Sequence, residues 1–293
     1  MTVDPIVALE SLGYTEREAS FLYLVAIHSG YFLRRQFNTF IERQKGFLAQ
    51  RFVEKGRIAG HIEIIDYGQG RFVYHLFSKP IYRLLGIADS QNRRRKGDGQ
   101  IRARLMALDY VFENPDEHYL ESEQLKRDFF TRTRGVDPGT VLDGAGRLHP
   151  FLGNFPVSVV DRAHQATSLV RFPFMDEGLL SMGRFTRFLT ELTPLLRALG
   201  AVEIVYIATS ERNFPEADRI FKRIFSPVIA QQQRLLGDFR PASAQPFPKN
   251  YPALHASFTT LLFHHSYPNL LRNECKESVV ESAHGSALEG ATT

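Results

Sequence analysis

The spacing of apolar residues changes period between residues 15 and 76, and this change constrains the fold more than any other feature of the chain. A helical spacing continues to about residue 55, and an alternating spacing then begins around Ile62 and Ile64. Residues 67–70 (Tyr-Gly-Gln-Gly) have the composition of a tight turn, and a second alternating run follows at residues 71–76. A group of helices followed by a β-hairpin is therefore predicted for the first part of the chain.

Three helices are predicted before the hairpin, at residues 15–27, 34–41 and 45–55, and a closing helix is predicted after it at residues 79–85. Thr15 and Glu18 have the spacing of a capping box at the start of the first helix. Gly56 is expected to end the third helix, with Leu48 and Phe52 on its buried side. The aromatic residues of the region are expected in its core; they are Phe21, Phe32, Phe37, Phe40, Phe47 and Phe52.

This order of elements resembles a winged helix-turn-helix, and two stretches of sequence carry the resemblance further. Residues 52–58 (FVEKGRI) are similar to the end of a recognition helix entering its wing, and residues 70–85 are similar to the second wing strand and the helix after it. The resemblance implies that residues 1–88 form a winged helix-turn-helix that binds DNA.

The charge of the chain is uneven in a way that agrees with a nucleic-acid partner. Up to Arg104 there are 17 Lys and Arg against 10 Asp and Glu, whereas the remainder has 19 against 22. A basic first third attached to a nearly neutral body is typical of a polyanion-binding module. Double-stranded DNA is therefore the expected partner, and the expected function is sequence-specific binding in a regulatory or accessory role.

The candidate DNA-binding residues fall into three groups. An α-helix fits the major groove, where Gln and Arg recognise adenine and guanine edges, and the wing of this fold reaches phosphates or the minor groove. A basic run beside the module would add phosphate contacts. The residues are Arg43, Gln44, Lys45 and Arg51 at the third helix, Gln69 and Arg71 at the turn, and Arg93, Arg94, Arg95 and Lys96 in the basic run.

Residues 89–100 are polar, contain glycine and carry clustered positive charge, so an exposed basic linker is expected there. Beyond it, helices and strands alternate over residues 101–236. The helices are predicted at residues 101–113, 182–199 and 216–236, and the strands at residues 118–120, 157–160, 169–174 and 202–208. An irregular stretch is expected at residues 134–155, a proline-rich loop and C-terminal helical segment at residues 237–276, and a disordered tail at residues 277–293.

The order of elements in this second part resembles the core of the restriction-endonuclease-like fold. It also resembles the C-terminal half of the replication-relaxation family, winged-helix proteins associated with plasmids and other mobile elements. The stretches that carry this resemblance are residues 156–157 (Pro-Val), 174–178 (Phe-Met-Asp-Glu-Gly) and 209–212 (Thr-Ser-Glu-Arg). With the first part included, it covers roughly residues 10–225. It implies an α/β (α+β) protein with a nuclease-like second domain, and a role in transcriptional regulation or mobile-element replication.

The second domain departs from the pattern that a nuclease of this fold requires. Such an enzyme needs an acidic residue at the start of the second strand and another two residues before a lysine on the third. Val157 and Phe174 stand at the two acidic positions, and no lysine occurs between Lys126 and Lys222. The domain is therefore expected to be catalytically inactive, with no catalytic residues, metal or cofactor.

Two other functions remain open at this point. One is a metal-dependent DNA nuclease that uses Asp161, Asp176 or Glu177, and the other is a protein-interaction adaptor built on a winged helix. A homodimer would supply the base contacts that a single winged helix lacks. The lone cysteine, Cys275, and the absence of a secretory signal or a long apolar stretch lead us to expect a cytoplasmic protein without a membrane partner.

Overall fold

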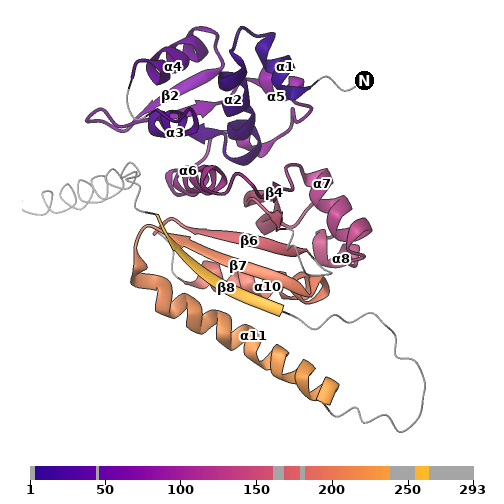
Figure 1. Cartoon of the computed structure of the whole chain (residues 1–293). Coiled ribbons are helices and arrows are strands. Elements are labelled where there is room, and N and C mark those ends of the chain that lie inside the picture. Colours follow the sequence, from indigo (N-terminus) through magenta and orange to yellow (C-terminus); the bar gives the residue numbers. More distant parts are fainter. Residues whose placement is uncertain (1–3, 44–45, 161–167, 179–181, 238–254, 264–293) are drawn as a thin grey trace, which may run out of the picture. The chain divides into compact units, whose positions relative to one another are not determined.

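The computed structural model describes residues 4–43, 46–160, 168–178, 182–237 and 255–263. The chain divides into two compact units, unit 1 up to Leu105 and unit 2 from Met106, and each combines helices with a sheet of its own (Figure 1). The predicted mixed α/β class is therefore confirmed. Within the part of the chain that the structure describes, no helix has both the length and the apolar character needed to span a bilayer.

Unit 1 places a helix pair, a short strand and two further helices ahead of a β-hairpin. Its strands form an antiparallel sheet in the order β1-β3-β2. The elements are α1 (Pro5–Glu10), α2 (Glu16–His28), β1 (Tyr31–Phe32), α3 (Arg34–Phe40), α4 (Leu48–Ile58), β2 (Ile62–Asp66), β3 (Phe72–Leu76), α5 (Lys79–Leu84), the 3-10 turn η1 (Gln91–Arg93) and the first part of α6 (Asp98–Glu113).

The predicted start of α2 is confirmed in atomic detail. The Thr15 backbone N–H donates to the Glu18 carboxylate at 2.9 Å, and the Thr15 hydroxyl accepts from the Glu18 N–H at 3.4 Å. This reciprocal pair is a capping box, which satisfies two N–H groups that helical geometry leaves without partners. The turn expected at residues 67–70 also forms, joining β2 to β3.

The sheet of unit 1 is covered on both faces. On one face, Phe32 of β1 meets Phe21 of α2 edge-on with ring centroids 5.3 Å apart. On the other face, Tyr31 and Val73 form a buried cluster with Leu105 and Ile101 of α6. The beginning of α6 therefore belongs to the core of unit 1.

The position of α4 differs from the prediction of a helix at residues 45–55. It begins at Leu48 and continues through Gly56 to Ile58. Gly56 does not end the helix because it serves a packing role: a Cβ at this position would lie 2.3 Å from the Ile62 Cδ1 atom on β2. Leu48 is half exposed rather than buried, and Ile58 is the last residue of the helix.

The exposed linker expected at residues 89–100 is instead bound to unit 1. Asn92 is buried, and its side-chain amide donates to the carbonyls of Ala26 and Ile27 at 3.0 and 2.8 Å. These carbonyls lie in the last turn of α2, where helical geometry leaves acceptors unpaired. The segment therefore closes the end of α2 before the chain enters α6.

Unit 2 contains a five-stranded sheet in the order β4-β5-β6-β7-β8. The first three strands pair antiparallel, and β6, β7 and β8 run parallel. After α6, the elements are β4 (His118–Tyr119), α7 (Glu123–Asp128), the π-helical turn η2 (Phe129–Thr133), α8 (Pro138–Val141), α9 (Pro150–Asn154), β5 (Ser158–Val160), β6 (Leu169–Asp176), α10 (Gly183–Leu199), β7 (Ala201–Ala208), the 3-10 turn η3 (Glu211–Asn213), α11 (Phe214–Gly237) and β8 (His255–Leu262).

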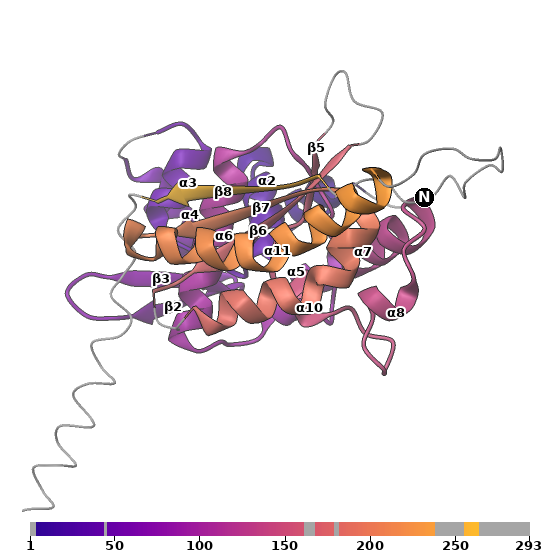
Figure 2. The same ribbon diagram turned by 90° about the horizontal axis from the view of Figure 1, so that it is seen from below.

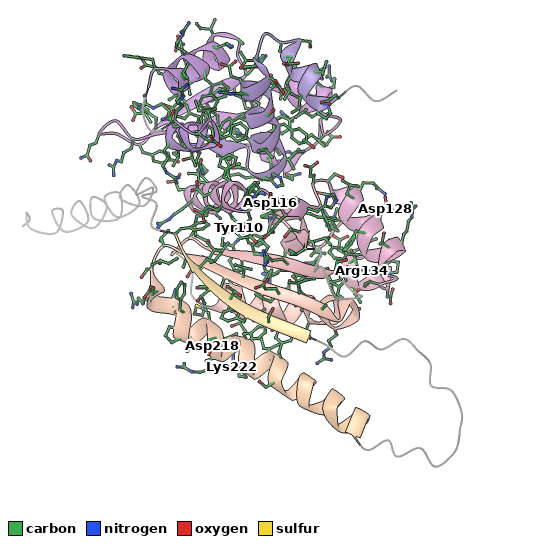
Figure 3. All side chains as sticks on the ribbon, viewed as in Figure 1. Tyr110, Asp116, Asp128, Arg134, Asp218 and Lys222 are labelled. Atoms are coloured by element: carbon green, nitrogen blue, oxygen red, sulfur yellow. The ribbon has the colours of Figure 1, made fainter. Side chains whose placement is uncertain are left out.

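One face of this sheet is covered by α10 and α11 (Figure 2). Aromatic side chains fill the space between these helices and the sheet. The ring centroid of Phe185 on α10 lies 5.1 Å from that of Phe174 on β6, and the centroid of Phe221 on α11 lies 5.0 Å from that of Phe258 on β8. The outer side of α11 is polar: Lys222 and Asp218 form an ion pair of 2.7 Å there (Figure 3). The helices predicted at residues 182–199 and 216–236 are therefore confirmed as α10 and α11.

Two expectations for unit 2 are corrected. The stretch at residues 134–155, expected to be irregular, contains α8 and α9, each with a proline in its first turn. Residues 255–262, part of the segment at residues 237–276 that was expected to be a loop and a helix, form strand β8, which pairs with β7. Residues 264–276 of that segment lie outside the described residues. Residues 238–254, which include most of the expected proline-rich loop, and the expected tail at residues 277–293 lie outside the described residues.

Candidate functional site

α4 is held against the core of unit 1 on one side. There, Phe52 stacks on Phe37 of α3 with ring centroids 4.3 Å apart and meets Phe21 of α2 edge-on at 5.6 Å. Lys55 fixes the C-terminal half of the helix, because its Nζ pairs with Glu18 of α2 at 2.5 Å. Contacts with α2 and α3 therefore determine which side of α4 faces away from the core.

The open side of α4 carries Phe47, Gln50, Arg51, Glu54 and Ile58, and we call these five residues the α4 open face. Their spacing of three and four residues places them along one side of the helix. The two ends of this face are apolar and strongly exposed, with Phe47 at 79% and Ile58 at 74% of full exposure. Its middle is polar, so the face combines hydrogen-bonding groups with two separate apolar contacts.

The two charged side chains of the α4 open face, Glu54 and Arg51, differ in whether they form an ion pair within the protein. Glu54 accepts two hydrogen bonds from the Arg57 guanidinium, at 2.9 and 2.6 Å, and this interaction lowers the pKa of the Glu54 carboxyl. Arg51 is exposed and forms no ion pair with any described residue. Arg51 is thus the cation of this face that is available to a partner molecule.

The β2–β3 hairpin lies beside α4, since Ile62 of β2 packs directly on Gly56 (Figure 1). At its turn, Gln69 is exposed and has a φ of 55°, in the left-handed region. Arg71 is partly buried, and its Nε donates to the Gly68 carbonyl at 3.2 Å. Of the two predicted turn residues, Gln69 is therefore presented outward, whereas Arg71 is folded onto its own turn.

The remaining predicted helix residues lie before α4. Arg43 is exposed in the connection from α3, and Gln44 and Lys45 lie outside the described residues. Sequence reasoning missed Phe47 and Gln50, because it started the helix too early and assigned the aromatic to the core. Gly46 was the available signal: glycine is a poor helix former, so it favours a later helix start.

The basic run at residues 93–96 lies on the other face of the sheet from α4. Neighbouring residues of a strand point to opposite faces, and Ile62 faces α4, so Glu63 faces away. Arg95 pairs with Glu63 at 3.3 Å, and the Lys96 N–H donates to the Tyr31 hydroxyl at 2.8 Å. Burial, followed by the nearby arginines, lowers the pKa of Lys96. The structure does not bring this run together with the α4 open face.

The same segment holds the other two arginines of the run. The Arg94 carbonyl accepts a hydrogen bond from the Tyr31 hydroxyl at 3.3 Å, whereas the Arg94 side chain is exposed. The Arg93 side chain is partly buried, with a buried Nε atom. The backbone of the run is thus anchored on the sheet rather than free to follow a bound polyanion.

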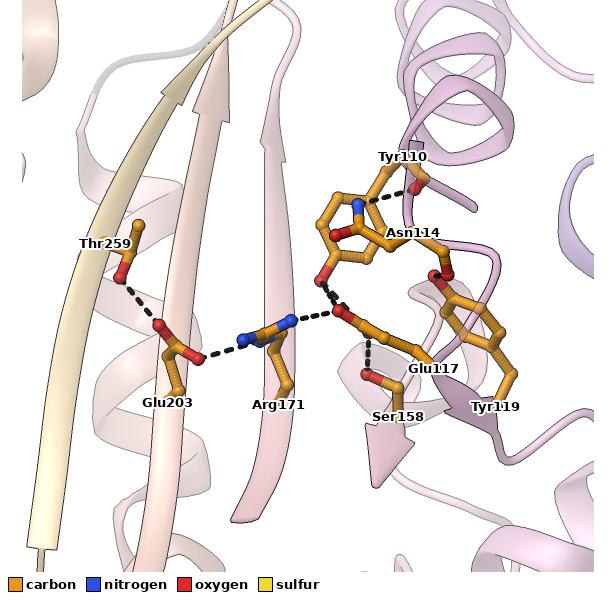
Figure 4. Close-up of polar contacts among 8 residues, drawn as sticks. All are labelled: Tyr110, Asn114, Glu117, Tyr119, Ser158, Arg171, Glu203 and Thr259. Carbon is orange, nitrogen blue, oxygen red and sulfur yellow. Dashed lines mark hydrogen bonds and ion pairs between the residues drawn. The ribbon is translucent and has the colours of Figure 1, made fainter. Parts of the chain in front are cut away.

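Unit 2 has a row of polar side chains that crosses all five strands or their ends (Figure 4). Its members are Glu117, Ser158, Arg171, Glu203 and Thr259. Arg171 stands between two glutamates: its guanidinium pairs with Glu117 and, at 2.7 Å, with Glu203. Ser158 donates to Glu117, and Thr259 donates to Glu203 at 2.7 Å. We call these residues the polar row, and their mutual pairing indicates a structural role.

A small pocket lies at the carboxyl ends of β6 and β7, where α/β sheets often bind ligands. Asp176 accepts hydrogen bonds from the Tyr206 hydroxyl, from the Asn213 amide at 2.9 Å and from a backbone N–H. Glu177 pairs with Arg184 at 2.5 Å. Burial raises the pKa of both the Tyr206 hydroxyl and the Glu177 carboxyl. Both carboxyl groups of the pocket are therefore already engaged within the protein.

The residues of the nuclease alternative are only partly placed. Asp161 lies outside the described residues. Val157 and Phe174, the residues that the resemblance aligns with the acidic positions of a nuclease, are buried. Among the described residues, no group of three or more His, Cys, Asp or Glu side chains is arranged to hold a metal ion.

No protein-family model, curated protein or solved structure significantly matches the chain, so relatives contribute nothing to the assignment of function.

Proposed function

We propose that unit 1 is a winged helix-turn-helix that binds double-stranded DNA through the α4 open face and the hairpin turn. The order α2–β1–α3–α4–β2–β3 and the sheet order β1-β3-β2 support this proposal, in which α4 is the recognition helix and the hairpin is the wing. The observation that carries the proposal is the fully open side of α4 next to an exposed hairpin turn.

The side chains available on this surface suit DNA. Gln50 and Arg51 are one helical turn from the start of α4, the part of a recognition helix that contacts base edges. Glutamine pairs with the adenine edge through two hydrogen bonds, and arginine does the same with guanine. Arg43, in the connection before α4, and Gln69, at the hairpin turn, are both exposed and suit phosphate contacts.

For unit 2, we propose an inactive scaffold in a DNA-binding protein that regulates transcription or assists replication of a mobile element. The pairing of Asp176 and Glu177 with neighbouring side chains supports a structural role over metal-dependent hydrolysis. A homodimer would double the number of base contacts and is part of the proposal.

The test is fluorescence anisotropy of the full chain with a labelled random 30-base-pair duplex over a salt series. The wild type is compared with Arg43→Ala/Arg51→Ala and with Arg83→Ala, which removes another exposed arginine, on α5. We expect the wild-type affinity to fall steeply as salt rises, because cations that contact phosphate release counterions. The double variant should bind more weakly with a shallower salt slope, and Arg83→Ala should match the wild type.

Absence of binding at low salt would contradict the proposal. Equal losses of DNA affinity in the double variant and in Arg83→Ala would also contradict the proposal. Such a result would mean that positive charge anywhere on unit 1 supports binding, whatever its position.

A protein partner is the second candidate, favoured by the exposure of Phe47 and Ile58. The two side chains are eleven residues apart, which corresponds to about 16 Å along a helix, and polar residues separate them. They therefore form two separate apolar contacts instead of the continuous core of a protein interface, and DNA remains the better match.

A further inference from the structure

Phe47 is the most exposed large apolar side chain of the described chain. It precedes the first residue of α4, and its neighbour Leu48 is 49% exposed. An aromatic ring in water costs free energy unless a partner covers it. Since α4 is fixed by its buried side, this ring projects at the start of the helix and needs an explanation.

The surroundings of Phe47 identify the kind of partner. Gln50 and Arg51 lie three and four residues further along the same face, so their Cα atoms are about 4.5 and 6 Å away along the helix axis. Base pairs in duplex DNA are about 3.4 Å apart. A ring at position 47 therefore meets a base one or two steps from the base that Gln50 or Arg51 contacts.

Only one base edge in the major groove offers an apolar group. Thymine carries a 5-methyl group there, and phenylalanine is one of the side chains that contact it. We propose that Phe47 is a specificity-determining residue that packs on a thymine 5-methyl group, next to an adenine or guanine contacted by Gln50 or Arg51. This inference rests on the proposed DNA binding and specifies the base that the surface selects.

The test removes the methyl group from the DNA without changing its base pairing. Duplexes that bind the full chain are first enriched from a randomised pool, and the enriched pool is then copied with either dTTP or dUTP. Affinities for the two copies are measured by anisotropy for the wild type, for Phe47→Ala and for Val7→Ala. Val7 is the control, because it is an exposed apolar side chain of unit 1, at 54% of full exposure, that lies on α1 and outside the α4 open face.

We expect the wild type to bind the uracil copy roughly fourfold more weakly for each thymine methyl group that a ring no longer covers. Phe47→Ala should bind the thymine copy more weakly than the wild type and should bind both copies equally. Val7→Ala should retain the wild-type affinity and the wild-type preference for thymine. Circular dichroism of each variant checks that the fold is unchanged, as expected for an exposed side chain.

Four results would separate the possible failures. If no duplex is enriched, DNA binding itself is absent, and both proposals fall. If duplexes are enriched but the wild type binds both copies equally, only the thymine contact is overturned. The contact is also overturned if Phe47→Ala keeps the preference for thymine, because the methyl group would then act through DNA shape. If Phe47→Ala leaves DNA affinity unchanged, the contact is overturned as well, and the ring is assigned to a protein partner.

Discussion

Gly30 shows how a single residue without a side chain permits two segments to approach. It follows α2 with a φ of 81°, and a Cβ here would lie 2.1 Å from the Asn92 carbonyl oxygen. Because the obstacle is backbone rather than a flexible side chain, no local adjustment relieves it. The glycine is required both for its conformation and for the space it leaves.

We therefore expect Gly30→Ala to destabilise the protein more than Gly13→Ala. Gly13 also has a positive φ, of 90°, but open space surrounds it. The left-handed conformation costs each variant about 1–2 kcal/mol, and the clash adds about 1–3 kcal/mol at Gly30 alone. Urea unfolding of both variants measures the difference, and equal losses would show that Asn92 moves freely.

Glu177 makes the stability of the folded chain depend on pH. Burial raises the pKa of its carboxyl, and Arg184 opposes this only in part. In the unfolded chain the carboxyl has its ordinary pKa, so the folded state holds the proton to a higher pH. The corresponding stabilisation is complete below the ordinary glutamate pKa and is lost as pH rises through the raised value.

Replacement of Glu177 by glutamine removes this titration. The free energy of unfolding of Glu177→Gln should therefore rise relative to the wild type as the pH increases from about 4 to about 7. Urea unfolding at several pH values provides the measurement, and Glu216→Gln, on α11 with a side-chain exposure of 42%, is the control. A difference that stays constant with pH would show that the carboxyl is not desolvated in solution.

Among the elements, α4 shows where sequence patterns succeed and where they fail. Phe52 and Val53 are buried, as helical spacing requires. The predicted end of the helix was wrong because a glycine near a helix end normally stops it, whereas Gly56 is held inside the helix by its contact with Ile62. Contact between residues of different elements decides such a case, and local propensity does not.

The strands of unit 2 depend on the polar row for part of their stability. Arg171 has a side-chain exposure of 22%, and its partners Glu117 and Glu203 have 8% and 12%. Arg171→Met would keep most of the side-chain volume and leave two largely buried carboxylates without their cation. We expect a loss of about 3 kcal/mol.

Arg187→Met is the matched control for this variant, because Arg187 forms an ion pair with Glu191 at 2.5 Å but is 70% exposed. Its loss should stay below about 1 kcal/mol. Thermal unfolding of the two variants measures this difference. Similar unfolding midpoints for Arg171→Met and Arg187→Met would mean that water already solvates the polar row.

At the scale of the whole molecule, the division of the chain lies later than the sequence indicated. Residues 89–100 were expected to link two domains, and residue 101 was expected to begin the second domain. In the structure Asn92 caps α2, and Ile101 and Leu105 cover the sheet of unit 1. The boundary between unit 1 and unit 2 therefore lies within α6.

A fragment of residues 1–105 should consequently fold, whereas one of residues 1–88 should be much less stable. The shorter fragment exposes Tyr31, Leu33 and Val73, which are buried in the full chain. A loss of about 2 kcal/mol corresponds to a fall in Tm of roughly 10 °C for a domain of this size. Circular dichroism on heating measures both Tm values, and equal values would refute the assignment of residues 89–105 to unit 1.

The sequence by itself determined the features that depend on neighbouring residues. These are the capping box of α2, the turn between β2 and β3, the helical and alternating periods of most elements, and the charge of the first third. Each follows from interactions within a few residues, which the local sequence contains in full.

Only the tertiary structure decided the features that depend on distant residues. The continuation of α4 through Gly56 depends on Ile62, the role of residues 89–105 depends on α2 and the sheet, and β8 exists as a strand because β7 offers it a parallel partner. The exposure of Phe47 likewise became visible only when the buried side of α4 was known. Packing and strand pairing join residues far apart in the chain, and a single sequence does not show which of them will meet.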